Sequence, residues 1–172
     1  MSRFGQEYRV GRSRGVCAAT GQPLEGGSVY LATLCDRPDD DGFDRLDFSL
    51  AAWESGARPE GLVGYWRTTL GASDTAGKPL VDEEVLMDLF EALAADTRRG
   101  RVAYRFVLAL MLLRRKRLKY VGRTGKGANE RWLMVPRGSE ATPPLEVVNP
   151  HLRDDEVREL ADQLGDLLPV QL

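Results

Sequence analysis

The stretch from Val102 to Arg117, VAYRFVLALMLLRRKR, decides how this chain folds. Apolar residues dominate it through Leu113 and fall on every side of a helix rather than along one stripe. A helix that is apolar all round has to be covered on all sides, so we predict a helix over 102–117 at the centre of the fold. The uninterrupted apolar run, 106–113, is far shorter than the ~18 residues that a membrane span requires. The pattern therefore indicates a core and no membrane partner.

Helix and strand patterns flank this central segment. Before it, we expect Asp82 to cap a helix whose apolar residues recur with helical spacing, at Val85, Leu86, Leu89, Phe90 and Leu93. After it come three strand candidates, LKYVG at 118–122, RWLMVP at 131–136 and LEVV at 145–148, the first two joined by a glycine-containing loop. A final helix is predicted from Asn149-Pro150, with Val157, Leu160, Ala161, Leu164 and Leu168 on one face.

The N-terminal third predicts a hairpin followed by a short helix. The stretches GSVYLATLCD at 27–36 and GFDRLDFS at 42–49 have strand composition, and the loop between them is rich in Asp, Pro and Gly. Ser49 is expected to cap the helix LAAWESG at 50–56. Together with the central helix and its flanking strands, this pattern predicts an α+β protein.

We expect four parts along the chain. Residues 57–80 are predicted to be a linker, whose Tyr65 and Trp66 pack on the core because large aromatic surface is costly to leave in water. The other parts are a flexible basic arm at 1–14, a hairpin unit at 15–56 and a body at 81–172 that packs with the hairpin unit as one globular unit.

The stretch VCAATG at 16–21 has the form of a zinc knuckle that lacks its second cysteine. With the hairpin and short helix behind it, it resembles the treble-clef zinc-binding arrangement over about Val16 to Ser55. That resemblance maps the ligand positions onto Cys17, Thr20, Ser49 and Ala52. Structural zinc requires four Cys or His ligands, and these positions offer one thiol, so we expect no metal here. The alternative is a plain turn in which Thr20 and Gly21 lead into a strand.

The same segment is similar to small bacterial proteins with a CaxTGxxLxxGxxY opening, matched by Cys17, Thr20, Gly21, Leu24, Gly27 and Tyr30. That resemblance implies no activity. If the segment folds without zinc, burial has to supply the stability that coordination would contribute. The candidates for this packing are Tyr30, Leu34, Phe43, Phe48 and Trp53.

The positive charge of the chain is concentrated in one block. Residues 98–126 hold eleven Lys and Arg and no acid, while the net charge of the whole chain is −2. Such asymmetry points to an anionic partner. The candidate contacts are Arg114, Arg115, Lys116, Arg117, Lys119, Arg123 and Lys126, with Tyr120 and Trp132 able to stack on bases if exposed. The alternative is that the block neutralises the acidic helix at 82–96 and favours a helix C-terminus.

No catalytic constellation is visible in the sequence. The two cysteines, Cys17 and Cys35, are accompanied by a single histidine, His151, at an expected helix start. The stretch GRTGKG at 122–127 lacks the spacing of a phosphate-binding P-loop. With few cysteines and no leader, we expect a cytoplasmic protein that is not an enzyme and binds no cofactor. The leading hypothesis is a module that binds another, unidentified protein, and the alternative is binding to nucleic acid, ribosome or another polyanion.

Overall fold

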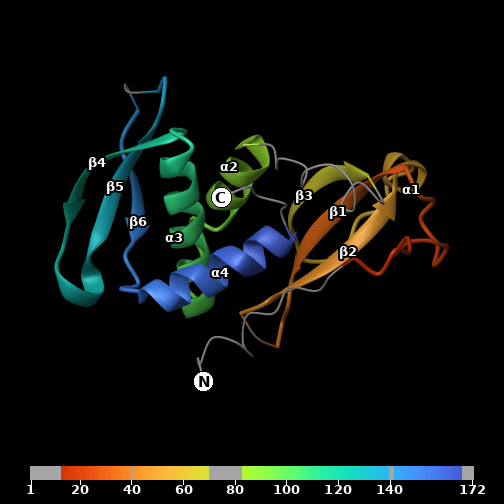
Figure 1. Cartoon of the computed structure of the whole chain (residues 1–172), viewed down its shortest axis with the longest axis horizontal. Helices are drawn as coiled ribbons and strands as arrows, with labels where there is room; N and C mark the ends of the chain where they lie inside the picture. The colour runs from red at the N-terminus through yellow and green to blue at the C-terminus, as the bar shows by residue number, and fades with distance from the viewer. Residues whose placement is uncertain (1–12, 40, 70–82, 140–141, 168–172) are drawn as a thin grey trace. The chain divides into compact units, whose positions relative to one another are not determined.

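The computed structural model of the chain describes residues 13–39, 41–69, 83–139 and 142–167 (Figure 1). The chain divides into two compact units. The first unit comprises residues 1–81 with 162–172, and the second comprises residues 82–161. The described residues form two three-stranded sheets and four α-helices, so the predicted α+β class is confirmed.

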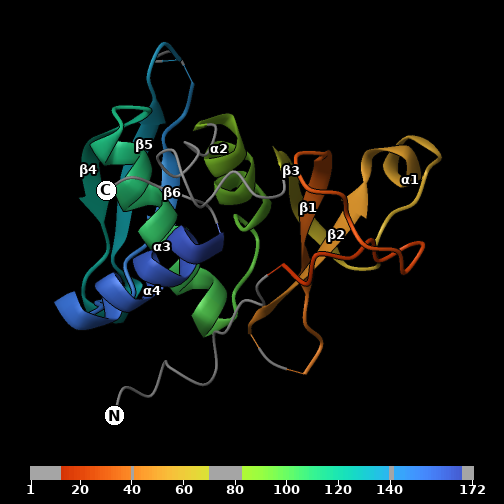
Figure 2. The same ribbon diagram turned by 45° about the vertical axis from the view of Figure 1, so that its right-hand side comes forward.

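The first unit is built on an antiparallel sheet with the strand order β2-β1-β3 (Figure 2). Its strands are β1 (Val29–Asp36), β2 (Phe43–Ser49) and β3 (Leu62–Thr69). The short helix α1 (Leu50–Glu54) follows β2 directly. Ser49 Oγ accepts a hydrogen bond from the Ala52 N–H at 3.2 Å, which confirms the predicted cap. Both strands of the predicted hairpin are confirmed as well.

The prediction of a linker at 57–80 is wrong for residues 62–69, which form β3. This strand pairs with β1 along its length, placing Trp66 opposite Ala32 and Tyr65 opposite Thr33. Side chains alternate between the two faces of a strand, so neighbouring aromatic residues have different environments. Trp66 is buried as expected, whereas Tyr65 is 53% exposed, contrary to the prediction that both pack on the core.

The five residues proposed for the core of this unit are mostly inside it. Tyr30, Leu34, Phe43 and Phe48 are buried, and Trp53 is partly buried. The Trp53 ring of α1 packs on the sheet. Its centroid lies 5.8 Å from that of Phe48 in β2 and 4.9 Å from that of Tyr65 in β3. The short helix is therefore held by aromatic packing as well as by its cap.

The second unit consists of two helices, a sheet and the start of a final helix. The helices are α2 (Glu83–Ala92) and α3 (Arg99–Arg114). The sheet has the order β4-β5-β6, with β4 (Leu118–Thr124), β5 (Arg131–Pro136) and β6 (Leu145–Val148), and the 3-10 turn η1 (Gly127–Asn129) lies between β4 and β5. Helix α3 contacts α2 on one side and β4 and β6 on the other, and eleven of its sixteen residues are buried (Figure 1). The predicted helix is confirmed, and it lies at the centre of the second unit.

Helix α3 ends three residues before the predicted boundary because of Lys116. The Lys116 backbone has a φ of 59°, in the left-handed region that favours glycine. Its N–H donates to Leu113 O at 3.0 Å, and the Arg117 N–H donates to Leu112 O at 2.9 Å. These two bonds form the closing pattern in which a left-handed residue ends a helix. Arg117 consequently lies outside α3.

The final helix, α4 (Asp154–Leu167), starts later than Asn149-Pro150 predicted. His151 has a φ of 51°, which interrupts any helix at that point. The Glu156 carboxylate accepts a hydrogen bond from the Arg153 N–H at 2.9 Å, half of a capping box at the true start. Leu160 and Leu164 are buried as predicted; Leu168 lies outside the described residues, as do Asp82 and the proposed arm except Ser13 and Arg14.

Two residues of the basic block belong to the core of the second unit. Arg101 is fully buried and Arg105 is 8% exposed, so neither presents its charge to a partner. The Arg105 guanidinium lies over the Phe90 ring, 4.5 Å from its centroid, and burial lowers the pKa of this side chain. Its Nε donates to Phe90 O at 3.1 Å and its Nη1 to Glu146 O at 2.8 Å. Arg105 therefore connects α2, α3 and β6.

We expect Arg105→Ala to lower the free energy of unfolding by roughly 2–6 kcal/mol, since two carbonyl oxygens lose their donor at about 1–3 kcal/mol each. Urea unfolding followed by circular dichroism measures the change. Arg114→Ala on the same helix is the control, because that side chain is exposed and its removal is expected to cost no more than about 0.5 kcal/mol. Equal losses in the two variants contradict the connecting role of Arg105.

Candidate functional site

The stretch VCAATG forms a tight turn closed by backbone hydrogen bonds. The Cys17 N–H donates to Gln22 O and the Gly21 N–H donates to Cys17 O, each at 2.8 Å, while Val16 pairs with Pro23. Gly21 has a φ of 70°, which explains why glycine occupies this position. The turn presents the Cys17 side chain inward, and this residue is 2% exposed.

Cys17 Sγ lies where β2 passes into α1. The Ser49 N–H donates to the sulfur at 3.3 Å, and Ser49 Oγ lies 3.6 Å from it. Ser49 Oγ in turn accepts from the N–H of Ala52, which is itself buried. Thr20 is the remaining position named from the sequence, and both its side chain and its backbone hydrogen-bond to Cys17. The structure therefore brings together all four positions, Cys17, Thr20, Ser49 and Ala52.

These contacts change the acidity of the thiol. Burial raises the pKa of Cys17, but hydrogen bonds from the Ser49 backbone, the Thr20 side chain, the Ser49 side chain and the Thr20 backbone outweigh it and lower the pKa to about 6. Sequence reasoning expected apolar packing in place of a metal and missed these donors. Ser at a helix cap and Thr three residues after Cys were the only signals for them. Among the described residues, no group of three or more His, Cys, Asp and Glu is placed to hold a metal ion.

Cys35 belongs to a different environment. It is buried in β1, where Thr33 Oγ1 lies 3.6 Å from its sulfur. Burial raises the pKa of this thiol, and the hydrogen bond with Thr33 opposes the rise only in part. Both cysteines are free thiols. The two sulfurs are thus distinguishable by titration.

The seven cations named from the sequence do not act as one group. Arg117 Nε lies 3.4 Å from the Glu83 carboxylate, and Arg123 Nη1 lies 3.7 Å from the Glu130 carboxylate. The Arg117–Glu83 pair supports the alternative that part of the block neutralises the acidic helix. Arg115 is partly exposed. The remaining four are exposed and make no ion pair with the described residues: Arg114, Lys116, Lys119 and Lys126.

An exposed aromatic ring accompanies these cations on β4. Tyr120 is 44% exposed, and its ring meets Trp132 edge-on with a centroid separation of 5.4 Å. Trp132 packs in the same manner on Phe106 of α3, at 5.1 Å. Tyr120 is therefore supported from the core of the unit while its outer surface stays accessible. A bulge at the next residue, Val121, leaves a second exposed apolar side chain beside it.

Comparison of the chain with protein-family models, curated proteins and solved structures finds no match. In the part of the chain that the structure describes, no helix is both long and apolar enough to cross a membrane.

We expect the thiol absorbance at 240 nm to titrate in two steps, the first near pH 6 for Cys17 and the second above pH 9 for Cys35. Because folding lowers the pKa of Cys17 from 9.0 to about 6, the unfolded thiol holds a proton across this interval that the folded one has lost. The resulting stabilisation is complete above pH 9 and is lost as the pH falls through 6, on the order of a few kcal/mol.

Cys17→Ala is expected to remove the first absorbance step. It should also remove the rise in the free energy of unfolding with pH between pH 6 and 9. Cys35→Ala serves as the control, since it removes the second step and leaves the first in place. A first step that persists in Cys17→Ala refutes the assignment.

Proposed function

We propose that the second unit binds single-stranded nucleic acid along β4. The observation that carries this proposal is the exposed Tyr120 ring, which is fixed by Trp132 and has cationic residues before and after it on the same strand. Proteins that bind single strands combine stacking rings with a positively charged track. This combination favours the polyanion hypothesis over the protein-binding module that the sequence analysis placed first.

The cations follow the strand in chain order. Arg114 and Lys116 lie at the turn between α3 and β4, Lys119 and Arg123 lie on β4, and Lys126 lies in the loop after it. A strand rises about 3.3 Å per residue, so Lys119 and Arg123 are separated by roughly 13 Å along β4, and Lys119, which adjoins Tyr120, points to the opposite face of the strand. That spacing suits a few nucleotides of an extended strand. Arg123 shares the Tyr120 side of β4, because the bulge at Val121 shifts the register so that their partners, Trp132 and Met134, are two residues apart on β5.

Lys116 supports the proposal through its backbone. A side chain in the left-handed region costs roughly 1–2 kcal/mol relative to the ordinary helical one, and glycine is the usual residue where a helix closes in this way. A lysine at this position is therefore less favourable for stability than a glycine would be. The helix dipole favours a cation at this helix end, and contact with a phosphate is a second reason for one.

We further propose that the protein acts in the cytoplasm, since Cys17 and Cys35 are both free thiols and reduced cysteines are typical of that compartment. Binding to another protein is a second proposal. It is favoured by Tyr65, which is 53% exposed on β3, an edge strand of its sheet, beside the Trp53 ring. An apolar contact through Tyr65 is expected to respond little to salt.

Tyr120→Ala is expected to weaken binding to a fluorescein-labelled oligouridylate or oligothymidylate by roughly 1–3 kcal/mol, the contribution of one stacked base. Fluorescence anisotropy at several salt concentrations measures the affinity. The matched control is Tyr65→Ala, which removes a tyrosine of the first unit that is 53% exposed, against 44% for Tyr120, and should leave affinity unchanged. No binding by the wild type at low salt, or equal affinity of the two variants, overturns the proposal.

Lys116→Gly is expected to raise the free energy of unfolding by about 0.5–1 kcal/mol, because the relief of left-handed strain exceeds the extra freedom of glycine in the unfolded chain. The same variant should bind single strands several-fold more weakly, with a salt slope reduced by ~0.7 for the lost phosphate contact. Thermal unfolding and salt-dependent anisotropy measure the two effects. A stabilised variant with unchanged affinity shows that Lys116 contacts no phosphate.

A further inference from the structure

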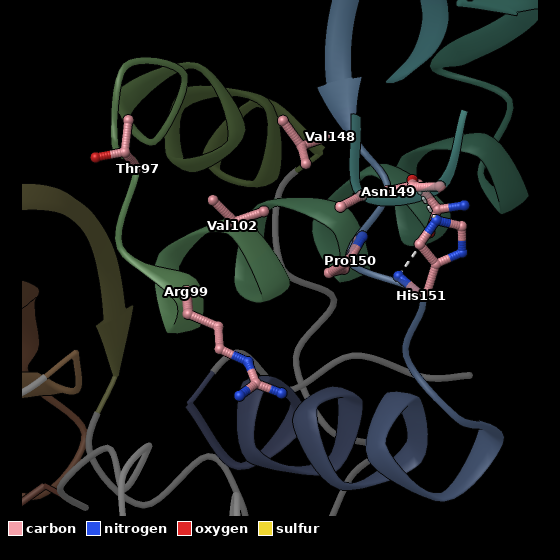
Figure 3. A pocket seen from close by; sticks show the side chains of 9 residues that line it. Thr97, Arg99, Val102, Val148, Asn149, Pro150 and His151 are labelled. Carbon is pink, nitrogen blue, oxygen red and sulfur yellow. Dashed lines mark hydrogen bonds between the residues drawn. The ribbon is translucent and has the colours of Figure 1, made fainter. Parts of the chain in front are cut away.

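A pocket of about 560 Å³ lies within the second unit, at the end of β4 opposite Lys116 (Figure 3). It is formed by the start of α3, the loop after β4 and the segment after β6, and its lining residues are Thr97, Arg99, Val102, Gly127, Ala128, Val148, Asn149, Pro150 and His151. This volume is in the range of small-molecule sites. Lys126, the last cation of the proposed track, precedes the lining residue Gly127. The pocket is thus continuous in sequence with the track.

A connected set of hydrogen bonds holds one wall of this pocket. Glu130 Oε1 accepts from Asn149 Nδ2 at 2.7 Å and from Trp132 Nε1 at 3.1 Å, and these two bonds lower the pKa of the Glu130 carboxyl. Asn149 Oδ1 accepts from the His151 N–H at 2.9 Å. The wall is therefore fixed through Trp132, the ring that also supports Tyr120. Hydrogen bonds within the chain hold this wall.

His151 closes this wall against the loop after β4. Its Nε2 lies 2.8 Å from Gly127 O, and because a carbonyl oxygen only accepts, Nε2 carries the hydrogen of this bond. The second ring nitrogen, Nδ1, is left to accept from or, when protonated, donate to a ligand. The left-handed backbone that His151 adopts directs the chain into this arrangement in place of a helix.

The lining combines an apolar floor with polar groups at both ends. Figure 3 shows Val102 and Pro150 between Arg99 on one side and His151 on the other. No carboxylate lines the pocket. Arg99 is the first residue of α3 and supplies the cation of the lining, while the Asp96 carboxylate accepts from the Arg98 N–H at 3.0 Å at the same helix start. An anion joined to a ring or another apolar group fits this distribution.

We propose that the pocket binds a nucleotide with a terminal phosphate, its phosphate at Arg99 and its ring against Val102, Val148 and Pro150. Such a nucleotide has two sources: it is free in solution, or it is the end of a strand that lies along β4. The second source rests on the proposed function. The same chemistry recognises both. As the end of a strand, it gives the single-strand site a defined terminus.

Two assays test the two sources. Anisotropy compares one oligouridylate with a 5′-phosphate, a 3′-phosphate or hydroxyl groups at both ends, and methyl NMR follows Val102 and Val148 on addition of uridine monophosphate. A terminal phosphate at one end is expected to raise affinity about ten-fold, and free nucleotide is expected to shift both methyl signals. Equal affinity of all three strands together with unshifted methyl signals overturns the inference.

Variants assign the effect to the pocket. Arg99→Gln is expected to remove the ten-fold gain while it binds the hydroxyl-ended strand as the wild type does, and Arg137→Gln, an exposed arginine outside the pocket, should keep the gain. His151→Gly, which tolerates the left-handed backbone, is a second variant expected to reduce the gain without loss of fold. A gain that survives in both pocket variants overturns the assignment.

The outcomes separate this inference from the proposed function. Shifted methyl signals without binding of any strand leave the pocket as a free-nucleotide site and reject the track along β4. Strand binding that depends on Tyr120 but not on a terminal phosphate, with no methyl shifts, keeps the track and rejects the pocket.

Discussion

The two hydrogen bonds of Arg105 are the contact on which the second unit depends. In a helix that is apolar nearly all round, the apolar residues alone do not determine which side faces a sheet and which faces another helix. Arg105 fixes the orientation of α3, because its guanidinium donates to the carbonyl of Phe90 in α2 and to that of Glu146 in β6. Its position over the Phe90 ring replaces water with an aromatic face. The sheet that bears Tyr120 is positioned by this contact.

The first unit is organised around a sulfur atom instead. Four positions that a zinc ion would connect in the treble-clef arrangement are connected here by hydrogen bonds to and around Cys17 Sγ. One sulfur atom takes part in several hydrogen bonds at once, so Cys17 joins the turn at 16–23 to the start of α1. The knuckle that raised the possibility of a lost metal site is therefore a polar junction.

Backbone strain marks both ends of β4. Lys116 and His151 are the residues other than glycine with a positive φ among those the structure describes, and one precedes the strand while the other closes the pocket beyond it. Glycine at either position would close the same turns with less strain. Their side chains instead place a cation at the start of the proposed track and an imidazole at its end. Strain retained at such positions is commonly part of a binding site.

Local sequence determined the elements whose signals are contained within a few residues. The apolar helix at 102–113, the hairpin around its Asp-rich loop and the Ser49 cap follow from periodicity and capping chemistry, which act between near neighbours.

Tertiary structure decided what depends on distant partners. Strand β3 forms because β1 offers it an edge, and Tyr65 and Trp66 are sorted to opposite faces only once that register exists. Arg101 and Arg105 belong to the basic block in the sequence but are buried in the structure, and Arg105 is covered by α2 and β6, since burial depends on how the elements pack. In the same way, Cys17, Thr20, Ser49 and Ala52 were named from the sequence as one site, but the hydrogen bonds that replace a metal there became definable only when the turn and the helix start met.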